Sequence, residues 1–149
     1  MMQRAESVVP SRIFRDDVSL SVVGMGGIVL MGMEQAEADR TVARALERGV
    51  NYFDVAPSYG KGEAEEKLGP ALQPHRHRAF LACKTHARDA QTARQHLETS
   101  LKRLRTDHFD LYQFHGLAKA EDAEKILAPG GAAETVLQAR EEGKIRFIG

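Results

Sequence analysis

The stretch 51-NYFDVAPSYG-60 begins as an apolar β-type run, Asn51 to Val55, and ends in a polar loop that carries Tyr59. Similar runs recur on both sides of it, with helical patterns between them. These runs are Leu20 to Val23, Ala79 to Cys83, Phe109 to Phe114 and Ile145 to Ile148. Short strands that alternate with helices pair in parallel through right-handed crossovers, so the sequence predicts an α/β fold.

Four segments between these runs carry an apolar stripe at helical spacing. They are Glu34 to Arg48, Glu63 to Leu72, Asp89 to Leu104 and Ala133 to Glu142. Gly49 stands where the first helix is expected to end, and Asp89 is a candidate N-cap for the third. We expect Gly69 and Pro70 to end or kink the second helix early.

Two architectures satisfy this alternation of strands and helices. One is an open doubly wound sheet such as the flavodoxin-like fold, which suits a chain of 149 residues, and the other is the (β/α)8 barrel. Periodicity does not separate the two. A complete barrel takes about 250 residues. The five strands predicted here would therefore form only an incomplete barrel.

Charge and hydropathy exclude several classes of protein. Lys plus Arg equals Asp plus Glu, at 21 each, so no basic field indicates a nucleic-acid partner. The longest apolar stretch, Leu20 to Met33, is interrupted by glycines and is shorter than the roughly 20 apolar residues of a membrane span. Met1 to Arg15 lacks the apolar segment of a secretory signal, so we expect a cytoplasmic protein.

The single cysteine, Cys83, excludes an internal disulfide and a cysteine-based zinc cluster. Its apolar flanks favour a buried structural thiol, and we predict no metal site. The segment 75-HRHR-78 could suggest metal or phosphate binding, but it precedes the third run and therefore lies far from the strand ends discussed next. A solvated basic loop is the interpretation that we favour for it.

Reactive side chains follow three of the predicted strands. Asp54 lies at the end of the second predicted strand and Tyr59 follows it, Lys84 comes directly after the third, and His115 directly after the fourth. Ligands bind at the carboxyl ends of the strands in both architectures, so we expect these four side chains to converge. Each alone has a structural explanation, as a strand-end cap, a loop aromatic, a solvated strand terminus or a turn residue. Their joint placement favours a functional site.

The chemistry of this set suits carbonyl reduction. An ammonium near a phenol favours the phenolate, so Lys84 beside Tyr59 would make that hydroxyl a usable general acid near neutrality. Asp54 would hold Lys84 in its charged form. His115 would donate a hydrogen bond to a carbonyl oxygen and stabilise the charge that grows there as hydride arrives at the carbon.

At these residues the sequence resembles the aldo-keto reductase family, whose Asp, Tyr, Lys and His tetrad occurs in Phe-Asp-x-Ala-x-x-Tyr-Gly and at two later strand ends. The resemblance extends from 22-VVGMGG-27 through 62-GEAEEKLG-69 to 143-GKIRFIG-149. It implies a (β/α)8 barrel, of which residues 1–149 would be the N-terminal part with about the first five βα units. It also implies an oxidoreductase that transfers hydride from NADPH to aldehydes or ketones, with Tyr59 as the proton donor.

The resemblance also assigns cofactor contacts. It puts Gly26 and Gly27 in the loop after the first barrel strand, near the nicotinamide end of the cofactor, and it makes Asp54 the third cofactor-binding residue. A tight turn that needs glycine would account for both equally well. The order Gly-x-Gly-Gly lacks the third glycine of a dinucleotide fingerprint. In the family, strands six to eight hold the adenosine phosphate and much of the pyrophosphate, and this sequence does not contain them.

Two further observations complete the predictions. The segment 15-RDD-17 replaces the glycine-containing turn of the family's N-terminal hairpin. His86 and Arg88 lie on the reactive rim, but nothing in their spacing requires them, and we leave them outside the site.

Three hypotheses follow. In the first, this is an aldo-keto reductase sequence that acts on a small carbonyl substrate once its barrel is complete. In the second, it is an inactive truncated half-barrel that associates with itself or another chain through open sheet edges. The third, a flavodoxin-like sheet, explains none of the tetrad.

Overall fold

The computed structural model describes residues 8–15 and 17–149, so the N-terminal stretch judged for a secretory signal lies largely outside the described residues. The strands are β1 (Ser11–Arg15), β2 (Val18–Ser21), β3 (Met25–Gly26), β4 (Tyr52–Asp54), β5 (Phe80–Thr85), β6 (Phe109–Phe114) and β7 (Ile145–Ile148). The α-helices are α1 (Gln35–Glu47), α2 (Glu63–Leu72), α3 (Ala90–Arg103), α4 (Ala120–Leu127) and α5 (Ala132–Glu141). Three 3₁₀ helices are η1 (Gly27–Leu30), η2 (Tyr59–Gly62) and η3 (Gln73–Arg78).

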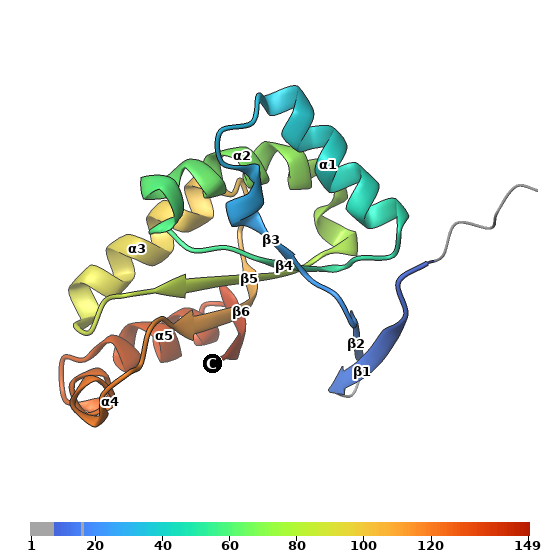
Figure 1. The fold of residues 1–149 in the computed structure, drawn as a ribbon. Coiled ribbons are helices and arrows are strands. Elements are labelled where there is room, and N and C mark those ends of the chain that lie inside the picture. Colours follow the sequence, from blue (N-terminus) through green and yellow to red (C-terminus); the bar gives the residue numbers. More distant parts are fainter. Residues whose placement is uncertain (1–7, 16) are drawn as a thin grey trace, which may run out of the picture.

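Five parallel strands form one sheet in the order β3-β4-β5-β6-β7, which is also their order in the chain. An open doubly wound sheet reverses its strand order at a switch point, whereas a barrel adds each strand beside the previous one. Helices α1, α2 and α3 lie along one side of β4 and β5 (Figure 1). The sheet is therefore an arc of a (β/α)8 barrel, and the flavodoxin-like alternative is wrong.

The first predicted strand is misplaced. Leu20 and Ser21 belong to β2, which pairs antiparallel with β1 in a hairpin, and the first parallel strand is β3. The side chain of Asn51 fixes the hairpin by accepting from the Ser21 amide at 2.7 Å and donating to the Ser19 carbonyl at 2.8 Å. The hairpin thus forms without the glycine-containing turn, although Asp16 lies outside the described residues.

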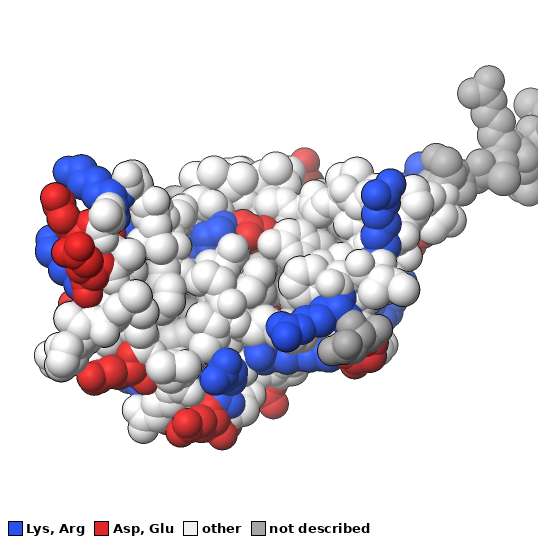
Figure 2. Space-filling model, turned by 90° about the horizontal axis from the view of Figure 1, so that it is seen from below, with Lys and Arg blue, Asp and Glu red and all other residues white. Residues whose placement is uncertain are grey.

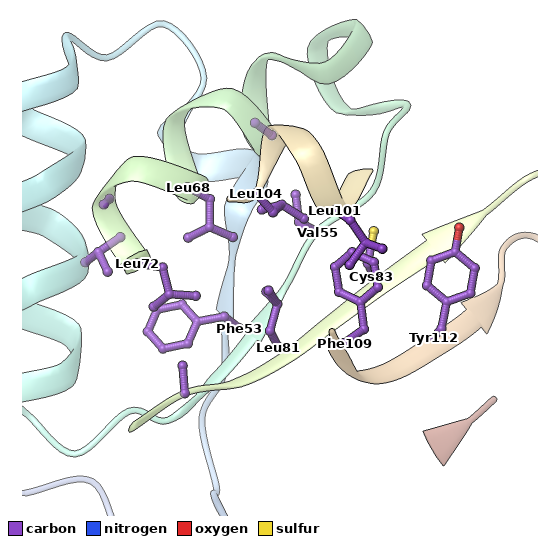
Figure 3. Packing of buried hydrophobic residues seen from close by; sticks show 14 of the residues in the cluster. Phe53, Val55, Leu68, Leu72, Leu81, Cys83, Leu101, Leu104, Phe109 and Tyr112 are labelled. Carbon is purple, nitrogen blue, oxygen red and sulfur yellow. The ribbon is translucent and has the colours of Figure 1, made fainter. Parts of the chain in front are cut away.

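The main core lies between the helices and the outer face of the sheet (Figure 3). Cys83 is fully buried there, as predicted, and burial raises the pKa of its thiol. Helix α2 continues to Leu72 in spite of Pro70, contrary to expectation, because Leu68 and Leu72 are buried in this core. Gly69 lets α2 approach α3, since a Cβ at that position would collide with the Arg103 carbonyl.

The inner face of the sheet is mostly white in Figure 2, apart from adjoining blue and red residues near its middle and charged residues around its rim. The ring of Phe80 stacks on Tyr52 at 5.8 Å and on Phe147 at 6.2 Å between centroids. Phe14 of the hairpin meets Phe80 and Phe147 edge-on, at 6.0 and 5.9 Å. The hairpin therefore covers one end of the arc, below the inner aromatic residues.

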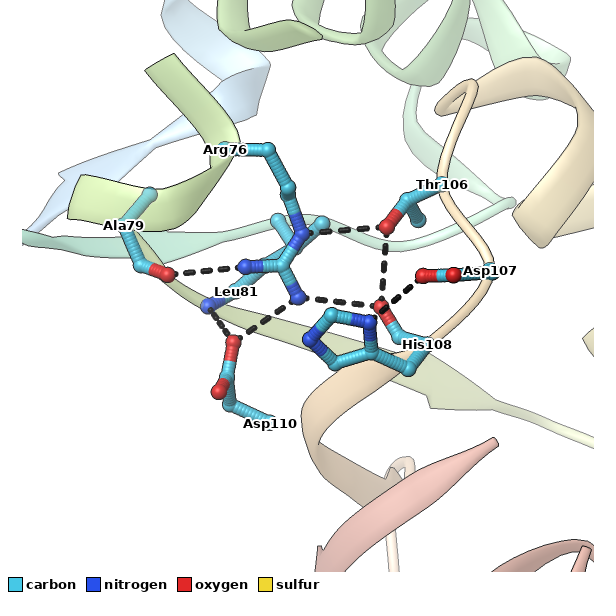
Figure 4. A network of polar contacts seen from close by, with 7 residues as sticks. All are labelled: Arg76, Ala79, Leu81, Thr106, Asp107, His108 and Asp110. Atoms are coloured by element: carbon cyan, nitrogen blue, oxygen red, sulfur yellow. Dashed lines mark hydrogen bonds and ion pairs between the residues drawn. The ribbon is translucent and has the colours of Figure 1, made fainter. Parts of the chain in front are cut away.

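A polar network joins η3 to the starts of β5 and β6 (Figure 4). Arg76 donates to Asp110 at 2.9 Å, to the Ala79 carbonyl at 2.8 Å and to the His108 carbonyl at 3.0 Å. Asp110 also accepts from the Leu81 amide at 2.9 Å. The side chain of Arg76 is only 17% exposed, so the prediction of a solvated basic loop is wrong for this arginine.

Candidate active site

Lys84 is the centre of the candidate site. Strand β5 extends beyond its predicted end at Cys83, so Lys84 lies within the strand, on the face that also carries Asp54 of β4. Its ammonium pairs with the Asp54 carboxylate and donates to the Tyr59 hydroxyl at 3.2 Å. Partial burial works against the charged form, but the hydrogen bonds to Asp54 and Tyr59 outweigh it and raise the pKa of Lys84.

The loop after β4 places Tyr59 over this ammonium. Gly60, Lys61 and Gly62 follow it with φ values of 60°, 55° and 103°, which turns the chain sharply into α2. Such values favour glycine, and two of the three residues are glycines. At Gly62 a Cβ would collide with the Arg103 guanidinium. This tight turn holds Tyr59 at the strand end.

His115 completes the set from the end of β6. Its amide donates to the Thr85 carbonyl at 2.9 Å, and its ring meets that of Tyr59 at 6.1 Å and 89°. The ring nitrogen Nδ1 is buried and has no hydrogen-bond partner among the described residues. Burial, followed by the influence of His86 and Lys84, lowers the pKa of His115. A neutral imidazole therefore faces the site near neutral pH.

The two glycines predicted near a cofactor have different surroundings. Gly26 is the last residue of β3, in register with Asp54, and a Cβ added to it would meet only Ile28, at 3.6 Å. Gly27 begins η1, and a Cβ there would press on Val55 at 3.0 Å, so close packing accounts for that glycine. The sequence prediction put both in a loop, whereas Gly26 is part of the strand.

Sequence reasoning left out three residues of this rim. The hydroxyl of Tyr52 lies 3.5 Å from Asp54, and burial, followed by that carboxylate, raises the pKa of Tyr52. The ring of His86 stacks on that of His115, and the Arg88 guanidinium donates a hydrogen bond to the His115 carbonyl. Tyr52 precedes Asp54 by two residues and His86 follows Lys84 by two, so the period of a strand was a signal that could have found both.

The four predicted side chains thus meet at the carboxyl ends of β4, β5 and β6, and together they can hold and transfer a proton. Among the described residues, no three of His, Cys, Asp and Glu gather into a metal-binding group. The Aldo/keto reductase family model matches residues 22–149. The chain belongs to the aldo-keto reductase family.

Relatives of known name agree with this assignment. The aldo-keto reductase YhdN of Bacillus subtilis is 33% identical over an alignment 156 positions long, which covers 96% of this chain and 45% of YhdN. The chain thus spans about half the length of the curated relatives that it matches. Aldo-keto reductases are oxidoreductases, so the family to which this chain belongs is a family of enzymes.

Solved structures of aldo-keto reductases superpose on the arc. The holo form of AKR11C1 from Bacillus halodurans has a TM-score of 0.76 at 29% identity, over 95% of this chain and 49% of that one. An enzyme from Klebsiella pneumoniae, in complex with NADP and acetate, has a TM-score of 0.70 at 31% identity, over 88% and 45%. In the part of this chain that the structure describes, no helix is both long and apolar enough to cross a membrane.

Proposed function

We propose that this aldo-keto reductase site reduces aldehydes or ketones to alcohols with hydride from NADPH, and that Tyr59 donates the proton. The observation that carries the proposal is the position of the Lys84 ammonium, which contacts both the Asp54 carboxylate and the Tyr59 hydroxyl. A phenol oxygen that accepts a hydrogen bond from an ammonium is stabilised as the phenolate, so the phenol releases its proton at lower cost, which suits a general acid.

The residues at the end of β3 suit a nicotinamide cofactor. The space beside the Gly26 Cα is open, since only Ile28 would meet a Cβ there, and Asp54 lies next to Gly26 across the β3–β4 pair. A flat ring could therefore approach Gly26 and Asp54 while it faces Tyr59 and His115. When bound, the dinucleotide supplies the hydride.

The residues of this chain supply the proton transfer. The carbonyl oxygen accepts hydrogen bonds from the Tyr59 hydroxyl and from a ring N–H of His115, which orients the carbon. As that carbon gains the hydride and its electron pair, the oxygen takes the Tyr59 proton, so the products are an alcohol and the oxidised dinucleotide. Lys84 then faces a phenolate, and its ammonium stabilises that negative charge until solvent returns the proton.

The reaction is tested with the chain as it is. Purified protein is mixed with NADPH and a nitrobenzaldehyde, and both the absorbance of NADPH and the alcohol product are followed. We expect alcohol to form in a one-to-one ratio with NADPH consumed, and Lys84→Met to lower the rate about a hundredfold or more. Failure of the wild-type chain to form any alcohol would contradict the proposal that these residues act without the rest of a barrel. The predicted cytoplasmic location stays a prediction.

A second candidate function is association through the open arc. Within the described five-stranded sheet, β3 and β7 each pair on one side only, and the inner aromatic face carries Phe14, which is 51% exposed. Unpaired strand edges and contiguous apolar surface favour contact with another chain.

Light scattering after size-exclusion chromatography measures this association. We expect a mass above that of the monomer, which Phe14→Glu lowers because it puts a charge on the inner face. Leu127→Glu is the control, because Leu127 is 75% exposed on α4, away from the strand edges. A clean monomer that unfolds cooperatively would contradict association.

A further inference from the structure

His86 touches both loops that carry the reacting side chains. It directly follows β5, and its ring stacks on that of His115 with 3.9 Å between centroids and 24° between planes. Its Nε2 lies 3.3 Å from the hydroxyl of Ser58, the residue before Tyr59. One imidazole therefore links the β4 loop, which carries the proton donor, to the β6 loop, which carries the carbonyl-orienting histidine.

Arg88 fixes the backbone on which these rings stand. Its guanidinium donates to the carbonyls of His86 at 3.2 Å, His115 at 3.0 Å and Gly116 at 3.2 Å. Its Nε pairs with Asp122 of α4 at 3.3 Å. Each guanidinium nitrogen therefore has a protein partner, so Arg88 acts within the rim as a clamp between the ends of β5 and β6.

We propose that His86 is a positioning residue for carbonyl reduction, which fixes the His115 ring against Tyr59 while Arg88 clamps the backbone beneath both histidines. The inference rests on the proposed function. A stacked ring at 3.9 Å leaves His115 little freedom to rotate, so its N–H direction is set before a substrate arrives. Pre-set donors stabilise developing charge without reorganising during the reaction.

The stack also affects the protonation of His115. Two protonated imidazoles at this separation would repel each other, and the neighbouring cations Lys84 and Arg88 add to that repulsion. Asp54 is the anion that opposes it, while Tyr59 and Ser58 are neutral neighbours. Burial, followed by the charges of Arg88, His96 and Lys84, lowers the pKa of His86. Burial, together with groups of β5, of the loop that follows it and of α3, thus keeps both rings neutral near pH 7.

Nuclear magnetic resonance of the whole chain tests the role without turnover. We compare the wild type with His86→Ala, which removes the stack, and His86→Phe, which keeps an aromatic ring without a titrating group. We expect the nuclear Overhauser contacts between the Tyr59 and His115 rings to be lost in His86→Ala and kept in His86→Phe. The pKa of His115 should rise toward its ordinary value in His86→Ala. His77→Ala is the control, since His77 is exposed near the start of β5.

Kinetics give the second measurement. In the reductase assay, His86→Ala should lower kcat/KM by about ten- to a hundredfold through misorientation, and His86→Phe should restore most of that loss. Unchanged Tyr59–His115 contacts and an unchanged His115 titration in His86→Ala would overturn the positioning role, whatever the rates are. A wild-type chain without turnover would count against the proposed function alone, because the resonance measurement does not depend on it.

Discussion

Tyr59→Phe is expected to lower the rate of carbonyl reduction by about 10²- to 10⁴-fold, because it removes the proton that the carbonyl oxygen must receive. The hydroxyl is the only group that this substitution deletes, and the ring that meets His115 edge-on stays in place. Lys84 remains paired with Asp54, so the change leaves no isolated charge. Steady-state oxidation of NADPH with a nitrobenzaldehyde measures the effect.

Tyr112→Phe is the matched control. This tyrosine lies on β6, is 1% exposed, and its hydroxyl makes no hydrogen bond of ordinary geometry among the described residues, with Thr85 as a polar neighbour. It packs on the core face of the sheet, opposite the site. We expect Tyr112→Phe to reduce the carbonyl at the wild-type rate. A Tyr59→Phe enzyme that keeps more than about a tenth of that rate would contradict a proton-donor role.

Asp110→Ala is expected to lower the free energy of unfolding by about 3–5 kcal/mol, because it leaves a largely buried guanidinium without its counter-charge. The side chains of Arg76 and Asp110 are 17% and 12% exposed, so water screens this pair weakly. The substitution also removes the acceptor of the Leu81 amide inside the sheet. Urea unfolding followed by circular dichroism measures the change.

Asp107→Ala is the matched control, because it removes a nearby carboxylate that lies on the surface and leaves the buried Arg76–Asp110 pair in place. Asp107 pairs with His108, but its side chain is 95% exposed, and exposed pairs contribute little to stability. We expect its unfolding midpoint to stay at the wild-type value. If Asp110→Ala and Asp107→Ala unfold at the same urea concentration, the hydrogen bonds and ion pair around Arg76 do not stabilise the folded state.

The parallel sheet followed from local patterns in the sequence. The runs at 109–114 and 145–148 match β6 and β7, because each strand buries apolar residues such as Phe109, Tyr112 and Ile145. Asp89 caps α3 by accepting from the Thr92 amide at 2.8 Å, as its position predicted. Where a local signal and tertiary packing agree, sequence reasoning succeeds.

Packing between distant segments explains the errors. Pro70 is a local helix-breaking signal, but burial of Leu68 and Leu72 against the sheet keeps α2 intact. The sequence predicts that Arg76 is one of several solvated basic residues, but the fold places Asp110, 34 positions later, beside it. Neither outcome can be read from neighbouring residues alone.

The sequence also predicted the placement of the candidate site's residues, but not the contacts between them. Strand ends placed Asp54, Lys84 and His115 on one rim without knowledge of the fold. The close contact of Lys84 with Tyr59 depends on the left-handed turn at residues 60–62, and no apolar pattern encodes that turn. The role of His86 depends on a stack between two loops, which only the assembled sheet reveals. The catalytic roles of all four residues stay predictions until the variants are measured.

The hairpin beneath the inner face has a consequence for the order of folding. Phe14 rests on Phe147, and Arg146 pairs with Asp17, 129 residues earlier in the chain, at 2.8 Å. Contacts across such a separation form late, because the loop that they close costs entropy that few local contacts offset. During synthesis the hairpin and its partners Asn51 and Phe80 emerge before β7, so the contacts with Phe147 and Arg146 are later to form. During refolding, β4, β5 and β6, together with the reactive rim that they carry, should therefore form before the hairpin packs on β7.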